Sequence, residues 1–316
     1  IKVHAVALCT LEQRIFMGEV KMPLPCTGGH EVSGEIVALG DGVNKKMWAP
    51  GDRVAVRLLY NCGECYYCRT GHANLCERAQ KKPVREGLLI GPGGLCDYVI
   101  VNTGYLFKIP DTLSYEEASL TEPLACVVHS VTKANIQLGE DVVVIGGGIM
   151  GQYHVMLAKR RGARVIMSEV DENRRALARK LGADITFNPM EKDPVEYVKS
   201  LTEGRGADVV FNTTAIPSVV PQAIAMTGKA GRMIQYSSMH PDAPAPVSPQ
   251  MLHGNEPILT GSISPDVHDF FTANRLLSGG IIDCKPLIAK KFPFEQAQQA
   301  FEAAIVPGTF RVIITD

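Results

Sequence analysis

The chain has 316 residues, of which 46% are apolar and 21% are charged. That balance is typical of a soluble globular protein, and the length suggests about two domains. Because 32 Lys and Arg face 33 Asp and Glu, the formal net charge is −1, and no overall positive field draws the chain to nucleic acid or anionic lipid. The sequence contains neither an apolar run of about 18 residues, as a transmembrane helix needs, nor a secretory signal pattern.

The first 120 residues or so contain short β-branched runs separated by Gly- and Pro-rich turns, which predicts an irregular β-rich domain. The chain begins without Met inside a strand-like run, Ile1–Leu8, so we expect part of the native N-terminus to be absent. Further strands are predicted at Glu31–Leu39, Asp52–Leu59 and Asp97–Asn102.

From Asp141 onward, apolar strands alternate with helical segments. This alternation predicts right-handed crossovers and a parallel sheet covered on both faces. The expected strands are Asp141–Ile145, Arg164–Glu169, Asp208–Phe211 and Gly231–Tyr236. The expected helices are Met150–Arg161, Glu172–Leu181 and Val219–Thr227. After a Pro-rich loop at 241–248, the pattern predicts two helices and a closing strand, at Val267–Leu277, Phe294–Ala304 and Phe310–Thr315.

Nine cysteines are present, an odd and unevenly spaced set that argues against a disulfide scaffold. We therefore expect metal binding in a reducing, cytoplasmic compartment. Four of the nine form Cys62-x2-Cys65-x2-Cys68-x7-Cys76, and four thiolates on one loop can close a tetrahedron around a structural Zn²⁺. An iron–sulfur cluster is the competing metal, and four unmetallated thiols are the least favoured reading. Ordinary buried thiols are expected at Cys26, Cys96, Cys126 and Cys284.

A glycine-rich turn, Gly146-x-Gly148-x-x-Gly151, follows a predicted strand and opens a predicted helix. This context is the one that a dinucleotide-binding fingerprint requires, because the glycines let the backbone approach a pyrophosphate at the helix N-terminus. Glu169 ends the next strand, where a carboxylate accepts hydrogen bonds from ribose hydroxyls and repels a 2′-phosphate, so the expected cofactor is NAD. A basic residue at Arg174 can serve either cofactor. The expected cofactor-binding set is Gly146, Gly148, Ile149, Met150, Gly151, Glu169 and Arg174.

A third group of residues has the composition of a catalytic zinc site. Cys9, His30, Glu31 and Glu122 supply a thiolate, an imidazole and carboxylates, a mixed set that leaves an exchangeable position on the metal. Spacing alone does not connect residues so far apart. A histidine before a strand and a Glu-Pro pair at a helix boundary are both commonly structural.

Taken in chain order, these motifs resemble those of the zinc-dependent medium-chain dehydrogenases. The matching elements are Cys9, Gly29-His30-Glu31, Gly51-Asp52-Arg53-Val54, the four-cysteine lobe, Glu122-Pro123-Leu124-Ala125 and Gly146-x-Gly148-x-x-Gly151. The Glu-Pro-Leu element is similar to that of the sorbitol and threonine dehydrogenase branch. The resemblance implies an α/β protein with a GroES-like β-rich catalytic domain, made from 1–124 and 264–316, and a Rossmann doubly wound parallel-sheet domain at 125–263. It also supports a truncated N-terminus.

The resemblance further implies residue roles and a reaction. Cys9 and His30 would bind a catalytic zinc, Glu31 would be a ligand or a neighbour of the metal, and Glu122 would bind the zinc or its water. One catalytic and one structural Zn²⁺ are expected. Zinc would lower the pKa of a secondary alcohol of a polyol or sugar, which would then pass a hydride to NAD⁺.

Two departures from the family put the substrate in doubt. Relatives usually place a hydroxyl residue and a histidine two and five positions after the catalytic cysteine, where this chain has Leu11 and Arg14. The proton therefore has to pass through Glu31, Glu122 or a water. Sorbitol dehydrogenases carry an Arg-Tyr pair after the glycine that corresponds to Gly261, whereas this chain reads Gly261-Ser-Ile-Ser-Pro265.

Alternative functions remain at this point. They are a threonine-type 3-hydroxy amino acid dehydrogenase and a non-catalytic NAD-binding protein that kept the fold. A zinc-free reductase is disfavoured by the cysteine lobe and the His30–Glu31 pair. The expected partners are a small-molecule alcohol and a second copy of the chain, in a homodimer or homotetramer paired through an edge strand near Pro257–Ile263, with no nucleic acid or membrane partner.

Overall fold

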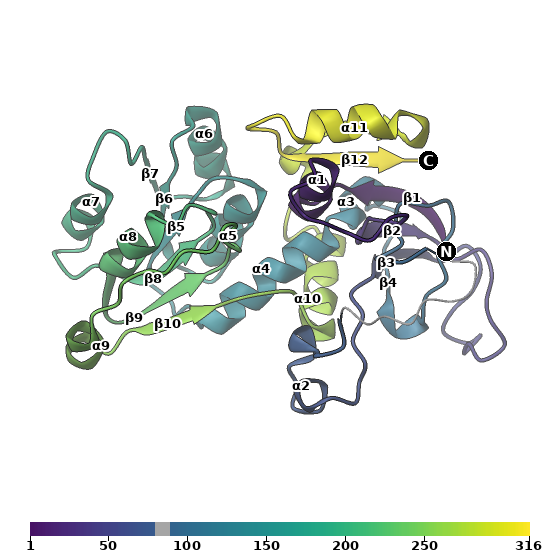
Figure 1. Ribbon diagram of the computed structural model, residues 1–316, viewed down its shortest axis with the longest axis horizontal. Helices are drawn as coiled ribbons and strands as arrows, with labels where there is room; N and C mark the ends of the chain where they lie inside the picture. Colours follow the sequence, from purple (N-terminus) through teal and green to yellow (C-terminus); the bar gives the residue numbers. More distant parts are fainter. Residues whose placement is uncertain (80–88) are drawn as a thin grey trace. The chain divides into compact units, whose positions relative to one another are not determined.

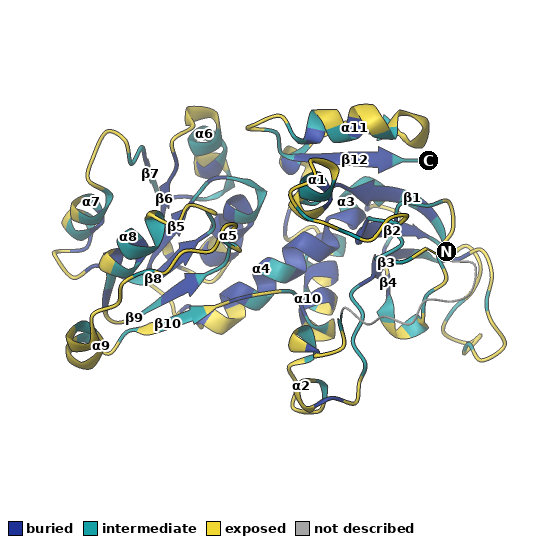
Figure 2. Cartoon of the chain, viewed as in Figure 1, coloured by how far each residue is buried: buried dark blue, intermediate teal, exposed yellow. Residues whose placement is uncertain are grey.

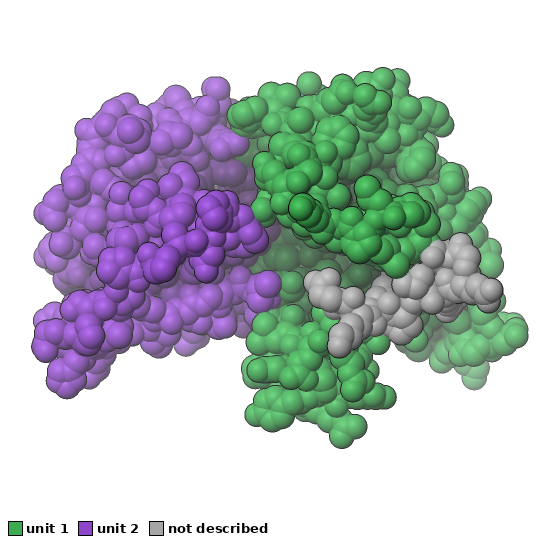
Figure 3. Space-filling view, in the orientation of Figure 1, with its two compact units in different colours: residues 1–126, 264–316 green, residues 127–263 purple. Residues whose placement is uncertain are grey.

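The computed structural model describes residues 1–79 and 89–316. The chain forms two compact units, shown in different colours in Figure 3. Unit 1 comprises Ile1–Cys126 and Ser264–Asp316, and unit 2 comprises Val127–Ile263. Both ends of the chain thus belong to unit 1, and unit 2 is inserted between them.

Unit 1 is built around a six-stranded sheet in the order β11-β12-β1-β2-β3-β4. Its strands are β1 Lys2–Ala7, β2 Glu31–Glu35, β3 Arg53–Arg57, β4 Leu106–Lys108, β11 Ile288–Pro293 and β12 Arg311–Thr315. The strands from β12 to β4 pair antiparallel with their neighbours, whereas β11 and β12 are parallel. Because β1 pairs with β12, the first and last strands of the chain lie side by side (Figure 1).

Short helices surround this sheet. They are α1 Thr10–Phe16, α2 Tyr66–Arg69, α3 Tyr115–Ser119, α10 Val267–Ser278 and α11 Ala297–Ala304, with 3-10 turns η1 Ala73–Leu75, η3 Thr103–Tyr105, η4 Lys285–Leu287 and η5 Phe294–Gln296. Capping boxes start α3 at Ser114 and α10 at Asp266, so their first backbone N–H groups are satisfied by side chains. Apolar residues of α11 and β12 pack together beneath Leu8, which fixes the loop that carries Cys9.

Unit 2 contains a parallel sheet in the order β10-β9-β8-β5-β6-β7. The strands are β5 Asp141–Ile145, β6 Arg164–Ser168, β7 Ile185–Phe187, β8 Ala207–Asn212, β9 Thr227–Gln235 and β10 Ile258–Gly261. The chain order reverses between β5 and β8. This reversal is the topological switch point at which doubly wound sheets bind dinucleotides.

The helices of unit 2 cover both faces of its sheet. They are the end of α4 Thr121–Ala134, α5 Ile149–Arg160, α6 Glu172–Leu181, α7 Pro194–Leu201, α8 Val219–Met226 and α9 Pro249–Asn255. Helices α5 and α6 pack against each other, and so do α7 and α8. The central strands are buried on both sides, as the dark blue arrows in Figure 2 show, and this matches their nearly continuous apolar sequences.

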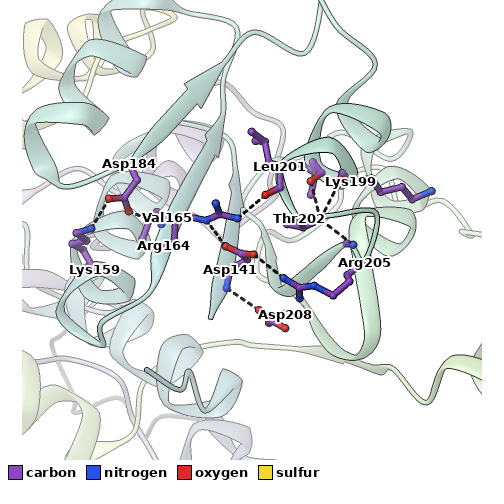
Figure 4. Close-up of polar contacts among 12 residues, drawn as sticks. Asp141, Lys159, Arg164, Val165, Asp184, Lys199, Leu201, Thr202, Arg205 and Asp208 are labelled. Atoms are coloured by element: carbon purple, nitrogen blue, oxygen red, sulfur yellow. Dashed lines mark hydrogen bonds and ion pairs between the residues drawn. The ribbon is translucent and has the colours of Figure 1, made fainter. Parts of the chain in front are cut away.

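An ion-pair network joins the amino ends of three strands in unit 2, as Figure 4 shows. Asp141 begins β5, and its carboxylate accepts a hydrogen bond from Arg164 Nε at 2.5 Å and lies 3.7 Å from Arg205 Nη2. The Asp141 backbone N–H donates to Asp208 Oδ2 at 2.8 Å. These contacts lie at the edge opposite the carboxyl ends of the strands, so they stabilise the sheet and leave its ligand-binding edge free.

The expected fold class, a GroES-like β-rich part with a Rossmann sheet, is confirmed. The prediction of a strand at Asp97–Asn102 is wrong, because this stretch contributes only an isolated bridge between Tyr98 and Lys2. Its exposed apolar side chains, such as Ile100, have no sheet face to cover. In the described residues, no helix is long and apolar enough to cross a membrane.

Candidate active site and cofactor site

The four-cysteine motif folds into one cluster on a lobe that follows β3 and contains α2 and η1. The ligand atoms of Cys62, Cys65, Cys68 and Cys76 all lie within 4.8 Å of one another. The sulfurs of Cys62 and Cys68 are 4.0 Å apart, as are those of Cys65 and Cys76. Four sulfurs around Zn²⁺ are separated by about 3.8 Å, so the cluster fits a tetrahedral zinc.

The surroundings of the cluster favour thiolates held by a cation. The backbone N–H of Cys62 donates to Cys76 Sγ at 3.3 Å, and that of Cys65 donates to Cys62 Sγ at 3.4 Å. Backbone donors lower the pKa of Cys65 to about 6. Burial and the neighbouring Cys65 raise the pKa of Cys68 to about 12, and a bound metal ion would favour its thiolate.

The second cluster begins at the N-terminus of α1, which Cys9 precedes as the N-cap residue. Cys9, Glu12 and His30 offer ligand atoms within 4.8 Å of one another. Glu12 Oε1 lies 2.8 Å from His30 Nδ1 and accepts a hydrogen bond from the Gly29 N–H at 3.1 Å. A proton on Nδ1, shared with Glu12, would leave Nε2 of His30 available to bind a metal.

The charges of this pair stabilise each other in a buried environment. Burial raises the pKa of Glu12, but the charge and hydrogen bond of His30 outweigh it, so the pKa lies below its ordinary value. Burial lowers the pKa of His30 and the charge of Glu12 raises it, and the net result is a pKa well above the ordinary value. A carboxylate placed in this way increases the basicity of an imidazole that binds a metal.

Two more carboxylates complete the cluster. His30, Glu31 and Glu122 also offer ligand atoms within 4.8 Å of one another. Glu31 begins β2 and is held by Arg311, whose Nε donates to Oε2 at 2.8 Å and whose Nη2 donates to Oε1. Burial raises the pKa of Glu31 to about 7, against the opposing charge of Arg311. Glu122 lies in the first turn of α4 and accepts a hydrogen bond from Cys126 Sγ at 3.4 Å.

The structure thus brings together Cys9, His30, Glu31 and Glu122, which the sequence placed far apart. It adds Glu12 and Arg311, which sequence reasoning missed. Glu12 is three residues after Cys9, so once α1 is recognised as a helix both residues lie on its first turn. No sequence signal identifies Arg311, because its partner Glu31 is 280 positions away.

The glycine-rich turn links β5 to α5 at the switch point of unit 2. Gly146 has a φ of +99°, which favours glycine, and a Cβ on Gly151 would lie 1.9 Å from the carbonyl oxygen of Gly146. A Cβ on Gly148, by contrast, would meet no atom within 4 Å. The N-terminus of α5, with Ile149 and Met150 in its first turn, is therefore open to a pyrophosphate.

Glu169 lies at the carboxyl edge of the same sheet and contacts the glycine-rich turn. Its Oε2 accepts a hydrogen bond from the Gly147 N–H, and its Oε1 accepts one from the Asp171 N–H at 2.8 Å. Arg174 Nη1 lies 4.0 Å from Glu169 Oε2. The structure thus places the predicted acidic residue against the predicted phosphate turn, with a guanidinium beside it.

The structure also shows the surroundings of the positions at which the sequence departs from the family pattern. Leu11 is 43% exposed on α1, and Arg14 Nε donates to Glu19 Oε2 at 3.2 Å. The segment after Gly261 ends at Pro265, whose carbonyl oxygen accepts a hydrogen bond from Arg57 Nη2 at 3.3 Å. A guanidinium therefore does lie at this segment, but it comes from β3.

Comparison with known proteins identifies the family. Residues 1–111 match the alcohol dehydrogenase GroES-like domain, and residues 150–279 match the zinc-binding dehydrogenase domain. The chain is 33% identical over 320 residues to D-arabitol-phosphate dehydrogenase of Enterococcus avium, covering 99% of this chain and 88% of the relative. The chain is a zinc-dependent medium-chain dehydrogenase.

Further comparisons agree. Sorbitol dehydrogenase of Bacillus subtilis is 31% identical over 312 residues, which is 96% of this chain and 86% of the relative. A structure from Sinorhizobium meliloti 1021, solved with bound NADP, has a TM-score of 0.90 and 29% identity, and the match covers all of this chain and 91% of the other. The protein is an alcohol-type oxidoreductase that uses zinc and a nicotinamide cofactor. The zinc-binding family also favours zinc over an iron–sulfur cluster at the four cysteines.

Proposed function

We propose that this dehydrogenase oxidises a secondary alcohol of a polyol or sugar, free or phosphorylated, with NAD⁺ as the hydride acceptor. The observation that carries the proposal is the gathering of Cys9, His30, Glu31 and Glu122 at one buried cluster. The names of its relatives support the substrate class, because one acts on a polyol phosphate and another on a polyol. A protein that only binds NAD has no use for such a metal cluster.

The contacts of each side chain suggest its role. Cys9 and His30 would hold the catalytic zinc, with Glu12 orienting His30. Glu31 gives both carboxylate oxygens to Arg311, whereas within the described part of the chain the side-chain donor to Glu122 is the weak thiol of Cys126. Glu122 is therefore the better candidate for the remaining ligand, and Glu31 is a neighbour of the metal.

Zinc, when bound, supplies a Lewis acid that eases removal of the alcohol proton. The chain lacks a hydroxyl at Leu11, so a carboxylate of the cluster or a water has to accept that proton. With a pKa of about 7, Glu31 is suited to proton transfer near neutral pH. The residues of unit 2 would bind the nicotinamide cofactor, which is the hydride acceptor.

Unit 1 would serve as the catalytic domain and unit 2 as the NAD-binding domain. We propose NAD as the cofactor because a carboxylate at Glu169 repels a 2′-phosphate. Two observations favour NADP instead, namely the guanidinium of Arg174 beside Glu169 and the relative solved with NADP. Glu169→Ser should therefore lower the ratio of kcat/KM for NAD⁺ to that for NADP⁺.

We also propose that two copies pair through β10. This strand is an edge of the unit 2 sheet; its first residue, Ile258, is 56% exposed, and Ile263, two residues beyond its end, is 63% exposed. Exposed apolar edges of this kind are usually covered in closed symmetric oligomers. Sedimentation of the protein and of Ile258→Lys tests the pairing, and a monomeric wild type would contradict it.

The Cys9→Ala variant tests the enzymatic proposal against the non-catalytic alternative. The expected result is loss of alcohol oxidation with NADH affinity retained, because the glycine-rich turn belongs to the other unit. If Cys9→Ala oxidised alcohols as fast as the wild type, the cluster would have no catalytic role. L-Threonine among the substrates tests the amino acid alternative in the same assay.

A further inference from the structure

A buried guanidinium on β3 has no carboxylate within ion-pair distance in residues 1–79 and 89–316. Arg57 is 2% exposed. Its Nη1 donates to the Leu59 carbonyl at 2.7 Å and to Asn61 Oδ1 at 3.1 Å, whereas its Nε has no acceptor. Burying a charge without an ion-pair partner in contact costs stability, so the residue requires an explanation.

Arg311 shows how a guanidinium in unit 1 binds a carboxylate through its Nε and Nη2 nitrogens. Nε and Nη2 of Arg311 each donate to one carboxylate oxygen of Glu31. In Arg57, the same two nitrogens have one hydrogen bond among the described residues, from Nη2 to the Pro265 carbonyl at 3.3 Å. This Nε–Nη2 edge matches the spacing of two oxygens in a carboxylate or phosphate.

The strand register places Arg57 beside the catalytic cluster. Arg57 pairs with Glu31 across β2 and β3, so the two side chains lie on the same face of the sheet. Burial lowers the pKa of Arg57, and the carboxylates of Asp266, Glu122 and Asp269 act against that lowering from a distance. We therefore expect a substituent of a substrate bound at the cluster, next to Glu31 and Glu122, to come near this guanidinium.

We propose that Arg57 binds an anionic group, a phosphate or a carboxylate, carried by the alcohol substrate. The anion would accept a hydrogen bond from Nε and would replace the Pro265 carbonyl as the acceptor for Nη2. The contacts of Nη1 with Asn61 and the Leu59 carbonyl would stay in place. Tyr105, whose ring centre is 5.5 Å from the guanidinium carbon, supports the side chain. This inference rests on the proposed function, because the cluster defines where the alcohol lies.

Steady-state kinetics on substrates matched in carbon chain test the proposal. The set is galactitol, galactitol 1-phosphate and galactonate, with NAD⁺ and the zinc-loaded protein. Charged hydrogen bonds of this kind predict that Arg57→Met lowers kcat/KM for the preferred anionic substrate by about 10- to 100-fold, mainly through KM. The neutral polyol should change little, and Arg57→Lys, which keeps the charge, should fall between.

Arg53→Met is the matched control. Arg53 lies on the same strand, donates to the carbonyls of Pro110 and Leu113, and stacks 4.3 Å from the ring centre of Tyr115. It has a carboxylate, Asp111, at 3.8 Å. Its loss should lower stability and leave the ratio of anionic to neutral activity unchanged.

Binding measured by calorimetry separates this inference from the proposed function. Galactitol 1-phosphate and inorganic phosphate are titrated into the wild type and Arg57→Met with NADH present. Binding that depends on Arg57 supports the anion site even if no alcohol is oxidised, an outcome that would refute only the proposed function. Equal losses on charged and neutral substrates, or anion binding that survives Arg57→Met, would overturn the role of Arg57.

Discussion

The Glu12→Gln substitution tests how the candidate zinc ligand His30 is held. Glu12 is 3% exposed, with Oε1 2.8 Å from His30 Nδ1 and 3.1 Å from the Gly29 nitrogen. The glutamine keeps the shape of the side chain and removes its charge. A hydrogen bond to a charged group contributes about 1.5–3 kcal/mol, which corresponds to a change of about 10- to 150-fold in an equilibrium constant. We therefore expect the Kd of the catalytic zinc to rise by about 10- to 100-fold.

A chelator competition that counts the two zinc ions measures this effect. In Glu12→Gln, one ion should be released at a lower chelator concentration, while the ion held by the four cysteines keeps its affinity. Glu19→Gln is the control, because Glu19 follows the same helix, is 53% exposed and pairs with Arg14. If Glu12→Gln held both ions as tightly as the wild type, the orienting role of Glu12 would be refuted.

Three further predictions concern unit 2. Burial lowers the pKa of His154 from its ordinary 6.5 to about 4, so the unfolded chain binds this proton first. His154 should contribute a loss of about 3 kcal/mol of unfolding free energy as the pH falls from 6.5 to 4, and denaturant titrations should therefore show a flatter pH dependence in His154→Asn than in the wild type. Gly151→Ala should weaken NADH binding and lower the Tm, whereas Gly148→Ala should weaken binding alone, as fluorescence titration and thermal unfolding will show. Asp141→Asn should lower the unfolding free energy by about 1–2 kcal/mol, since the side chain is 7% exposed and its partner Arg164 is 43% exposed. If denaturant titrations gave Asp141→Asn the same unfolding free energy as the wild type, the stabilising role of Asp141 would be contradicted.

The parts of the fold that the sequence predicts are those with local signals. Strand–helix alternation predicts the parallel sheet of unit 2, and the glycine spacing predicts the turn between β5 and α5, because both patterns lie within a short stretch. Asp97–Asn102 shows the limit of this reasoning. Its residues have strand-like composition, but they pair through only one bridge, since pairing depends on a partner strand elsewhere in the chain.

The site was predictable where ligands share one loop and less so where they come from distant segments. The four cysteines are close in sequence and close in space. Cys9, His30 and Glu122 could be connected only through resemblance to a family. Arg311 and Arg57 act through contacts set by the order and register of the strands in unit 1, which spacing does not reveal.

Zinc-dependent reduction of the nicotinamide cofactor tests the central claim most directly. The zinc-loaded protein is given free and phosphorylated polyols, sugars, inositols, L-threonine and simple alcohols, each with NAD⁺ and with NADP⁺, and cofactor reduction is followed by absorbance. We expect turnover of a polyol or sugar substrate, faster with NAD⁺, that is lost when the catalytic zinc is removed. Turnover that survives zinc removal, or none on any alcohol by a protein shown to bind zinc and NAD, would contradict the account.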